Sequence, residues 1–119
     1  MSRIVVIDDS KLMRNLVRHL LEEAGHEVET WEEVTASDIP DRLRAANPDL
    51  VITDYMMPGC NGLTVAKRVK MAKPGLPVVV LTATHDPAVT DALNRQDVSR
   101  ILFKPLREEE LLQVVKQLT

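Results

Sequence analysis

Four short apolar runs, each continuous rather than alternating, constrain the fold of this 119-residue chain more than any other feature. They are Ile4–Ile7, Leu50–Thr53, Val78–Leu81 and Ile101–Phe103. Continuous runs of this length, rich in β-branched residues, are typical of strands buried on both faces of a parallel sheet. A fifth run, Glu27–Trp31, alternates polar and apolar residues and predicts an edge strand with one solvated face. The sequence therefore predicts five strands.

Helical patterns separate these runs. They cover Leu12–Leu21, Ser37–Ala46, Leu63–Val69, Val89–Leu93 and Leu111–Leu118. Gly25 is suited to a C-terminal cap, and Asp86 followed by Pro87 is suited to a helix start. Pro40 must lie in the first turn of its segment or break the helix. Strict alternation of strand and helix predicts an α/β doubly wound domain with right-handed crossovers.

Composition excludes several classes of protein. Apolar residues make up 45% of the chain and charged residues 28%, which argues against disorder. No apolar run approaches a membrane span, and the first residues lack the pattern of a signal peptide. A net charge of −3 and 3% aromatic residues argue against nucleic-acid binding. The single cysteine, Cys60, excludes an internal disulfide and fits a reducing compartment. We expect one cytoplasmic domain over residues 1–119.

Polar side chains follow four of the five predicted strands. They are Asp8 and Asp9 after the first strand, Asp54 after the third, Thr82 after the fourth and Lys104 after the fifth. Ligands of doubly wound folds bind at the carboxyl ends of the strands. We therefore expect three carboxylates, a hydroxyl and an amine to converge at one edge of the sheet.

Three carboxylates in one cleft repel one another, and a divalent cation resolves that repulsion. A donor set of oxygens without His or Cys suits Mg²⁺, which retains several waters. Asp8 and Asp9 would be its acidic ligands, and a main-chain carbonyl near Met56 could be another, because the following Pro58-Gly59 turn leaves backbone groups open.

An acidic metal site flanked by a hydroxyl and an ammonium is arranged to hold a phosphoryl group. Asp54, at the end of a central strand, could accept that group as an acyl phosphate. Each residue taken alone has a structural interpretation: Asp8 or Asp9 could cap the first helix, and Asp54 could be a turn residue. The conjunction of all five residues favours the phosphoryl site.

Four segments carry a resemblance to a known family. They are Ile7-Asp8-Asp9-Ser10, Thr53–Gly62, Leu81-Thr82-Ala83 and Phe103-Lys104-Pro105. Together, in this order and at strand ends, they resemble the receiver domain of two-component response regulators, over essentially the whole chain. The resemblance implies a CheY-like, flavodoxin-like parallel sheet with strand order 2-1-3-4-5.

The resemblance also implies roles for individual residues. Asp54 matches the phosphoacceptor, Thr82 the hydroxyl that moves to the phosphoryl oxygen, and Lys104 the lysine that pairs with it, usually before a cis proline. The implied Mg²⁺ ligands are Asp8, Asp9, Asp54 and the Met56 carbonyl. The implied partners are a sensor histidine kinase or phosphotransfer protein and an output domain or target, with phosphorylation-dependent dimerisation. At most slow self-phosphorylation and self-dephosphorylation is expected, with no enzymatic turnover.

The chain departs from the family pattern at several positions. Ile101 stands where receivers usually carry Tyr or Phe, three residues before the lysine. Asp97 replaces a glycine at the end of the fourth helix, and aspartate tolerates the left-handed conformation better than most residues. Arg107 stands where a Ser, Thr or Asp cap is usual. Met56 and Thr84 occupy the positions that help to place the hydrolytic water in this family.

Two other function classes share some of these features. A Mg²⁺-dependent phosphatase with an Asp nucleophile typically has a second acid two residues after the nucleophile, where this chain has Met56. The other class is a flavin-binding or purely structural α/β module. It would need a Gly/Ser/Thr-rich phosphate loop after the first strand, whereas Asp8-Asp9-Ser10-Lys11 carries charge of the wrong sign. A phosphoacceptor signalling domain is therefore the favoured interpretation.

Overall fold

A parallel sheet of five strands forms the centre of the molecule in the computed structural model, which describes residues 2–119. The strands are β1 (Arg3–Ile7), β2 (Glu27–Trp31), β3 (Leu50–Asp54), β4 (Val78–Thr82) and β5 (Arg100–Phe103). The helices are α1 (Lys11–Glu23), α2 (Ile39–Ala46), α3 (Gly62–Ala72), α4 (Pro87–Arg95) and α5 (Glu108–Leu118). The strand order is β2-β1-β3-β4-β5 and every pair is parallel, which confirms the expected doubly wound fold.

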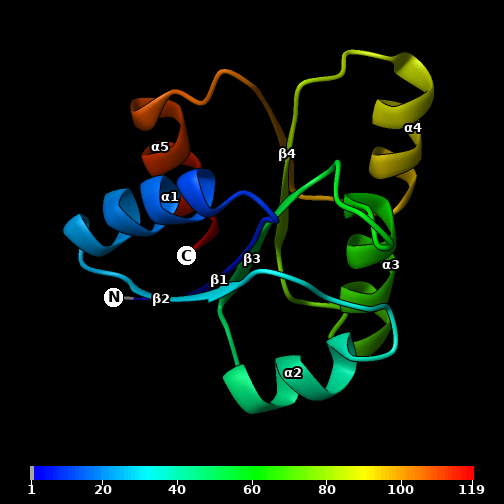
Figure 1. Cartoon of the computed structure of the whole chain (residues 1–119), viewed down its shortest axis with the longest axis horizontal. Coiled ribbons are helices and arrows are strands. Elements are labelled where there is room, and N and C mark those ends of the chain that lie inside the picture. Colours follow the sequence, from blue (N-terminus) through cyan, green and yellow to red (C-terminus); the bar gives the residue numbers. More distant parts are fainter. Residues whose placement is uncertain (1) are drawn as a thin grey trace.

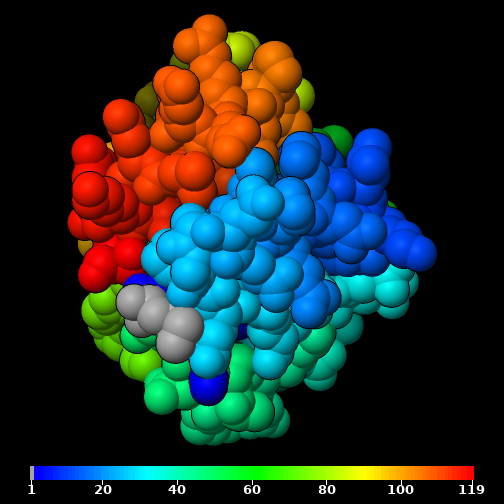
Figure 2. All heavy atoms as spheres, turned by 90° about the vertical axis from the view of Figure 1, so that its left-hand side faces the viewer, coloured from blue at the N-terminus to red at the C-terminus, as the bar shows by residue number. Residues whose placement is uncertain are grey.

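Helices cover both faces of the sheet in two layers. Helices α1 and α5 lie on one face, and α2, α3 and α4 lie on the other (Figure 1). Figure 2 shows α1 and α5 side by side across the first of these faces. Alternate residues of the central strands enter the two cores: Val5 and Ile7 pack with α2, α3 and α4, while Ile4 and Val6 pack with α1 and α5. This two-sided burial explains why the central runs are continuously apolar.

The edge strand β2 has the alternating burial that its sequence predicts. Its outward residues are exposed, and Trp31 at its end is buried beneath the guanidinium of Arg42, which lies 4.3 Å from the ring centroid. Among the described residues, β2 pairs with β1 alone in the sheet, and no strand there covers its other edge. No helix within residues 2–119 is long and apolar enough to cross a membrane.

Local capping sets the helix boundaries. The side chains of Ser10, Asn61 and Asp86 each accept a hydrogen bond from the first turn of the helix that follows. Pro40 lies in the first turn of α2, which is the position that a proline tolerates. Arg107 makes no side-chain cap at α5, whose first turn instead carries three glutamates that favour the helix dipole.

Two site residues lie one position deeper in the sheet than the sequence predicts. Asp54 and Thr82 were expected to follow their strands, but they are the last residues of β3 and β4. The reason is that the parallel ladders continue one step further, pairing Asp54 with Leu81 and Thr82 with Phe103. Both side chains are therefore fixed by backbone pairing rather than by a loop.

Candidate phosphoryl and metal site

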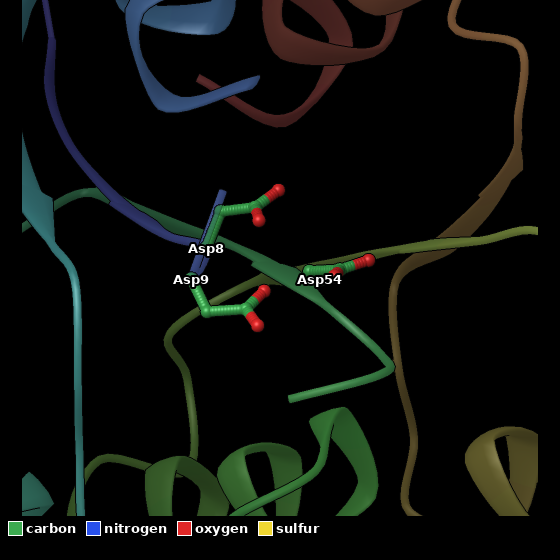
Figure 3. A group of neighbouring side chains, drawn as sticks. All are labelled: Asp8, Asp9 and Asp54. Atoms are coloured by element: carbon green, nitrogen blue, oxygen red, sulfur yellow. The ribbon is translucent and has the colours of Figure 1, made fainter. Parts of the chain in front are cut away.

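Three carboxylates meet at the carboxyl ends of β1 and β3. One oxygen each from Asp8, Asp9 and Asp54 lies within 4.8 Å of the other two. Figure 3 shows Asp8 and Asp9 leaving the end of β1 and Asp54 leaving the neighbouring β3, with their carboxylates on the same side of the strand ends. Asp8 and Asp54 are buried, whereas Asp9 is exposed. The structure thus brings together the three acids that the sequence singles out.

The close approach of α3 to β3 shapes one side of this site. A Cβ atom added at Gly62 would lie 2.9 Å from the main-chain oxygen of Asp54 and 2.9 Å from the Cα of Tyr55. The Gly62 amide also donates a hydrogen bond to the Tyr55 carbonyl at 2.8 Å. Glycine is therefore needed here, because a side chain would push α3 away from the strand end that carries Asp54.

Burial and repulsion between the carboxylates disfavour the charged form of Asp8 in the acidic cluster. Burial raises the pKa of the Asp8 carboxyl above its ordinary value of 3.8, and the Asp54 and Asp9 carboxylates raise it further. A hydrogen bond from the Ser10 amide and the charge of Lys104 act in the opposite direction. A hard divalent cation would relieve the repulsion, and an oxygen-only donor set fits such an ion.

Lys104 reaches the same site from β5. Its ammonium donates a hydrogen bond to Oδ1 of Asp54 at 2.8 Å, and its amide donates to the Thr82 carbonyl at 2.9 Å. The Lys104–Pro105 peptide is cis, as the resemblance implies. The ammonium thus lies against the carboxylate proposed as phosphoacceptor, where it can pair with an anion bound there.

Thr82 and Met56 differ in how they face the site. Thr82 is 1% exposed, and its hydroxyl oxygen accepts a hydrogen bond from the Thr84 amide at 3.1 Å. Met56 is 71% exposed, and its main-chain carbonyl, as an oxygen donor, is the part of this residue that suits a hard cation. Met57, the next residue, is partly buried and packs against the core.

One residue of the site is absent from the sequence-based prediction. Arg14 of α1 is a buried arginine whose guanidinium donates to the main-chain carbonyl of Asp8 at 2.7 Å. The helical pattern around it could have signalled this role, because Arg14 falls on the same face as the buried Val17 and Leu21. A charged residue on an apolar helix face usually has a specific partner.

Comparison with known proteins identifies the family. The family model of the response regulator receiver domain matches residues 4–116. The chain belongs to the response regulator receiver family. Its helices and its strand order are therefore those of a receiver domain.

Relatives of this receiver domain occur both as short proteins and as parts of longer ones. It is 30% identical to Protein CcdB of Bacillus subtilis over 119 residues, covering 98% of this chain and 97% of that protein. It is also 30% identical to the cyclic di-GMP phosphodiesterase response regulator RpfG of Xanthomonas campestris over 110 residues. That match covers 91% of this chain but 29% of RpfG, so the chain spans less than a third of that relative.

Solved structures agree with the sequence comparison. The chemotaxis protein CheY4 of Vibrio cholerae superposes with a TM-score of 0.89 at 28% identity, covering 100% of this chain and 99% of CheY4. The receiver domain of a signal transduction histidine kinase from Syntrophus aciditrophicus superposes with a TM-score of 0.87 at 26% identity, covering 99% and 89% of the two chains. The fold is thus shared with a chemotaxis protein and with the receiver domain of a histidine kinase.

Proposed function

We propose that this receiver domain, spanning residues 1–119, accepts a phosphoryl group on Asp54 from a histidine kinase or phosphotransfer protein and thereby switches an output. The observation that carries the proposal is the Asp54 carboxylate. It is nearly buried, it lies beside two further carboxylates, and it accepts the 2.8 Å hydrogen bond from the Lys104 ammonium.

In the proposed transfer, a carboxylate oxygen of Asp54 attacks the phosphorus of a phosphohistidine. An oxygen–phosphorus bond forms, the nitrogen–phosphorus bond breaks, and the imidazole leaves with the electron pair and takes up a proton. Lys104 then exchanges its carboxylate partner for a phosphoryl oxygen, which is a stronger charge-assisted pair. The Thr82 hydroxyl, whose oxygen accepts a hydrogen bond from the Thr84 amide, donates its own proton to a second phosphoryl oxygen.

We propose that Mg²⁺ is the cofactor, held by Asp8, Asp9, Asp54 and the main-chain carbonyl of Met56. The three clustered carboxylates and the raised pKa of Asp8 support this assignment. When bound, the ion would offset the negative charge that gathers between the acids and the incoming phosphoryl group.

The setting of this chemistry is also proposed. The domain acts in the cytoplasm, without membrane insertion or direct nucleic-acid contact, and its products are conformational states rather than released metabolites. Its only chemical turnover is slow self-phosphorylation and self-dephosphorylation. The output is a further domain or a target protein, reached with or without a phosphorylation-dependent dimer.

A phosphodonor assay tests the proposal. The parent protein, incubated with acetyl phosphate and Mg²⁺ and weighed intact, should gain the mass of one phosphoryl group. Asp54→Asn should remain unmodified, and Asp9→Asn should need much more Mg²⁺ for the same extent of labelling. Asp41→Asn, on the exposed surface of α2, is the matched control and should behave like the parent.

The same assay separates this proposal from the phosphatase alternative. Labelling of Asp54→Asn to the parent's extent would refute Asp54 as the acceptor. Release of many equivalents of phosphate per protein without a stable labelled species would instead indicate a phosphatase.

A further inference from the structure

Arg14 is a buried charged residue next to the acidic cluster. It lies in the second turn of α1, and the residue is 9% exposed. Burying a guanidinium costs free energy unless its donors are satisfied. The contacts of Arg14 therefore indicate what the residue is for.

The guanidinium of Arg14 makes two contacts through different nitrogens. Nη1 donates to the main-chain carbonyl of Asp8 at 2.7 Å. Nη2 lies 3.6 Å from a carboxylate oxygen of Glu32, in the loop directly after β2. A planar guanidinium presents donors on separate nitrogens in a fixed geometry, whereas an ammonium presents all of its donors from one nitrogen.

Hydrogen bonds fix the peptide groups on both sides of the Asp8 side chain. The Asp8 amide donates to the Trp31 carbonyl at 3.2 Å, and the Asp8 carbonyl accepts from Arg14. The Asp8 carboxylate also accepts from the Ser10 amide at 2.8 Å. The turn that carries Asp8 and Asp9 is thus held by β2 on one side and by α1 on the other.

We infer that Arg14 is a positioning residue, which holds the Asp8–Asp9 turn in the orientation that binds the divalent cation and ties that turn to the loop after β2. This inference rests on the proposed function for the identity of the ion. Arg14 acts on the ion through the backbone of Asp8 and contacts no reacting atom. Outer contacts of this kind commonly change metal affinity by about 10-fold to 100-fold.

The direction in which loss of Arg14 changes the Mg²⁺ affinity distinguishes a positioning role from a purely electrostatic one. Removing a positive charge beside a cation site should by itself strengthen cation binding, because like charges repel. Loss of the Asp8 carbonyl contact should weaken binding, because the two acids are no longer held in place. The two explanations therefore predict opposite changes in the Mg²⁺ dissociation constant.

The test is a Mg²⁺ titration of the full chain, followed by the backbone amide shifts of Asp8 and Asp9. Arg14→Met keeps the apolar stem and removes every donor, so the dissociation constant should rise about tenfold or more. Arg14→Lys keeps the charge but offers one nitrogen, so it should fall between Arg14→Met and the parent. Arg18→Met removes an equal charge from the exposed face of the same helix and should stay within about twofold of the parent.

Equal or tighter Mg²⁺ binding by folded Arg14→Met would overturn the inference. If Arg14→Met fails to fold, Arg14→Lys decides, and a dissociation constant equal to the parent's would overturn it. A parent that is phosphorylated, with Arg14 variants that bind Mg²⁺ normally, refutes the positioning role alone. If Mg²⁺ binding depends on Arg14 but the parent is never phosphorylated, the proposed function alone is refuted. A parent that binds no Mg²⁺ refutes both.

Discussion

Neighbouring aspartates in this site differ because their surroundings differ. Asp8 is buried, its carboxylate accepts the Ser10 amide, and its pKa is raised. Asp9, the next residue, is exposed to solvent. Asp54 is buried in the sheet and already holds the Lys104 ammonium. A cation can reach Asp9 with little loss of hydration, whereas Asp54 offers a desolvated nucleophile.

The lifetime of the acyl phosphate should depend on two residues next to the site. Met56 has no group that can orient a hydrolytic water. The Thr84 hydroxyl is short, and its oxygen already accepts a hydrogen bond from the Asp86 amide at 3.1 Å. Positioning of a reacting water is typically worth about 10²-fold or more in rate. We therefore expect slow self-dephosphorylation, and the double variant Met56→Asn with Thr84→Glu should lose its phosphate several-fold faster.

Decay of the labelled protein, followed by intact mass, measures this lifetime. Met71→Asn is a matched control, since Met71 is 74% exposed on α3 and Met56 is 71% exposed beside the site. The control should decay at the parent rate. Decay of the parent within seconds, or an unchanged rate in the double variant, would show that these two positions do not govern hydrolysis.

Among the elements, the segment between β4 and α4 is the one linked most directly to the site. The Thr84 amide donates to the Thr82 hydroxyl, and the His85 ring stacks on Phe103 of β5 with centroids 4.2 Å apart. Ile101 has no aromatic ring to turn between buried and exposed rotamers. When Thr82 moves to the phosphoryl oxygen, residues 82–87 should therefore carry the conformational change.

Amide chemical shifts with a phosphoryl mimic, beryllofluoride with Mg²⁺, measure this change. The largest shifts away from the acidic cluster should lie in residues 82–87 and at Phe103. The same reagents added to Asp54→Asn should produce almost none of them. Shifts centred on Ile101 with a silent 82–87 segment would contradict the expectation.

The end of α4 carries backbone strain that glycine would relieve. Asp97 has φ of +59°, in the left-handed region that non-glycine residues adopt at a cost. Asp97→Gly should raise the free energy of unfolding by about 0.5 kcal/mol, measured by urea denaturation. Asp91→Gly, within α4, should lower it by about 0.3 kcal/mol, because glycine is less favourable than aspartate in a helix interior. A loss of stability in Asp97→Gly would show that the aspartate side chain stabilises this turn.

At the scale of the whole molecule, the acidic cluster should reduce the stability of the metal-free protein. The folded-state pKa of Asp8 is raised, so folding disfavours its charged form. The resulting penalty is absent below the unfolded value of about 3.8 and fully present above the folded-state pKa. Without Mg²⁺ at pH 7, Asp8→Asn should therefore be more stable than the parent, by an amount on the order of 1 kcal/mol.

Urea denaturation at several pH values measures that difference. It should shrink as the pH falls through the folded-state pKa of Asp8 towards 3.8. Saturating Mg²⁺ should stabilise the parent more than the variant, because a ligand stabilises the state that binds it. A variant less stable than the parent at pH 7 without Mg²⁺ would mean that the Ser10 contact outweighs burial and repulsion.

Much of this molecule could be predicted from its sequence because the apolar runs and the polar residues at their ends indicate the same fold and the same site. Continuous apolar runs predicted the buried strands, and polar residues at their ends predicted the acidic cluster with Lys104. The exact strand ends were wrong at Asp54 and Thr82, because ladder pairing depends on the neighbouring strand. Arg14 was missed: its place on the face of α1 that carries Val17 and Leu21 could have indicated burial, but its partners, a main-chain carbonyl and a residue of another loop, follow only from the tertiary structure.

The most direct test of the central claim is to locate the phosphorylated residue. Borohydride reduces an acyl phosphate to the alcohol, so a phosphorylated aspartate becomes homoserine, which peptide mass spectrometry can identify. After treatment with acetyl phosphate and Mg²⁺, homoserine should be found at Asp54 and at no other position. Homoserine at Asp8 or Asp9, or at none of the three aspartates in a protein that binds Mg²⁺, would contradict the assignment of Asp54 as the phosphoacceptor.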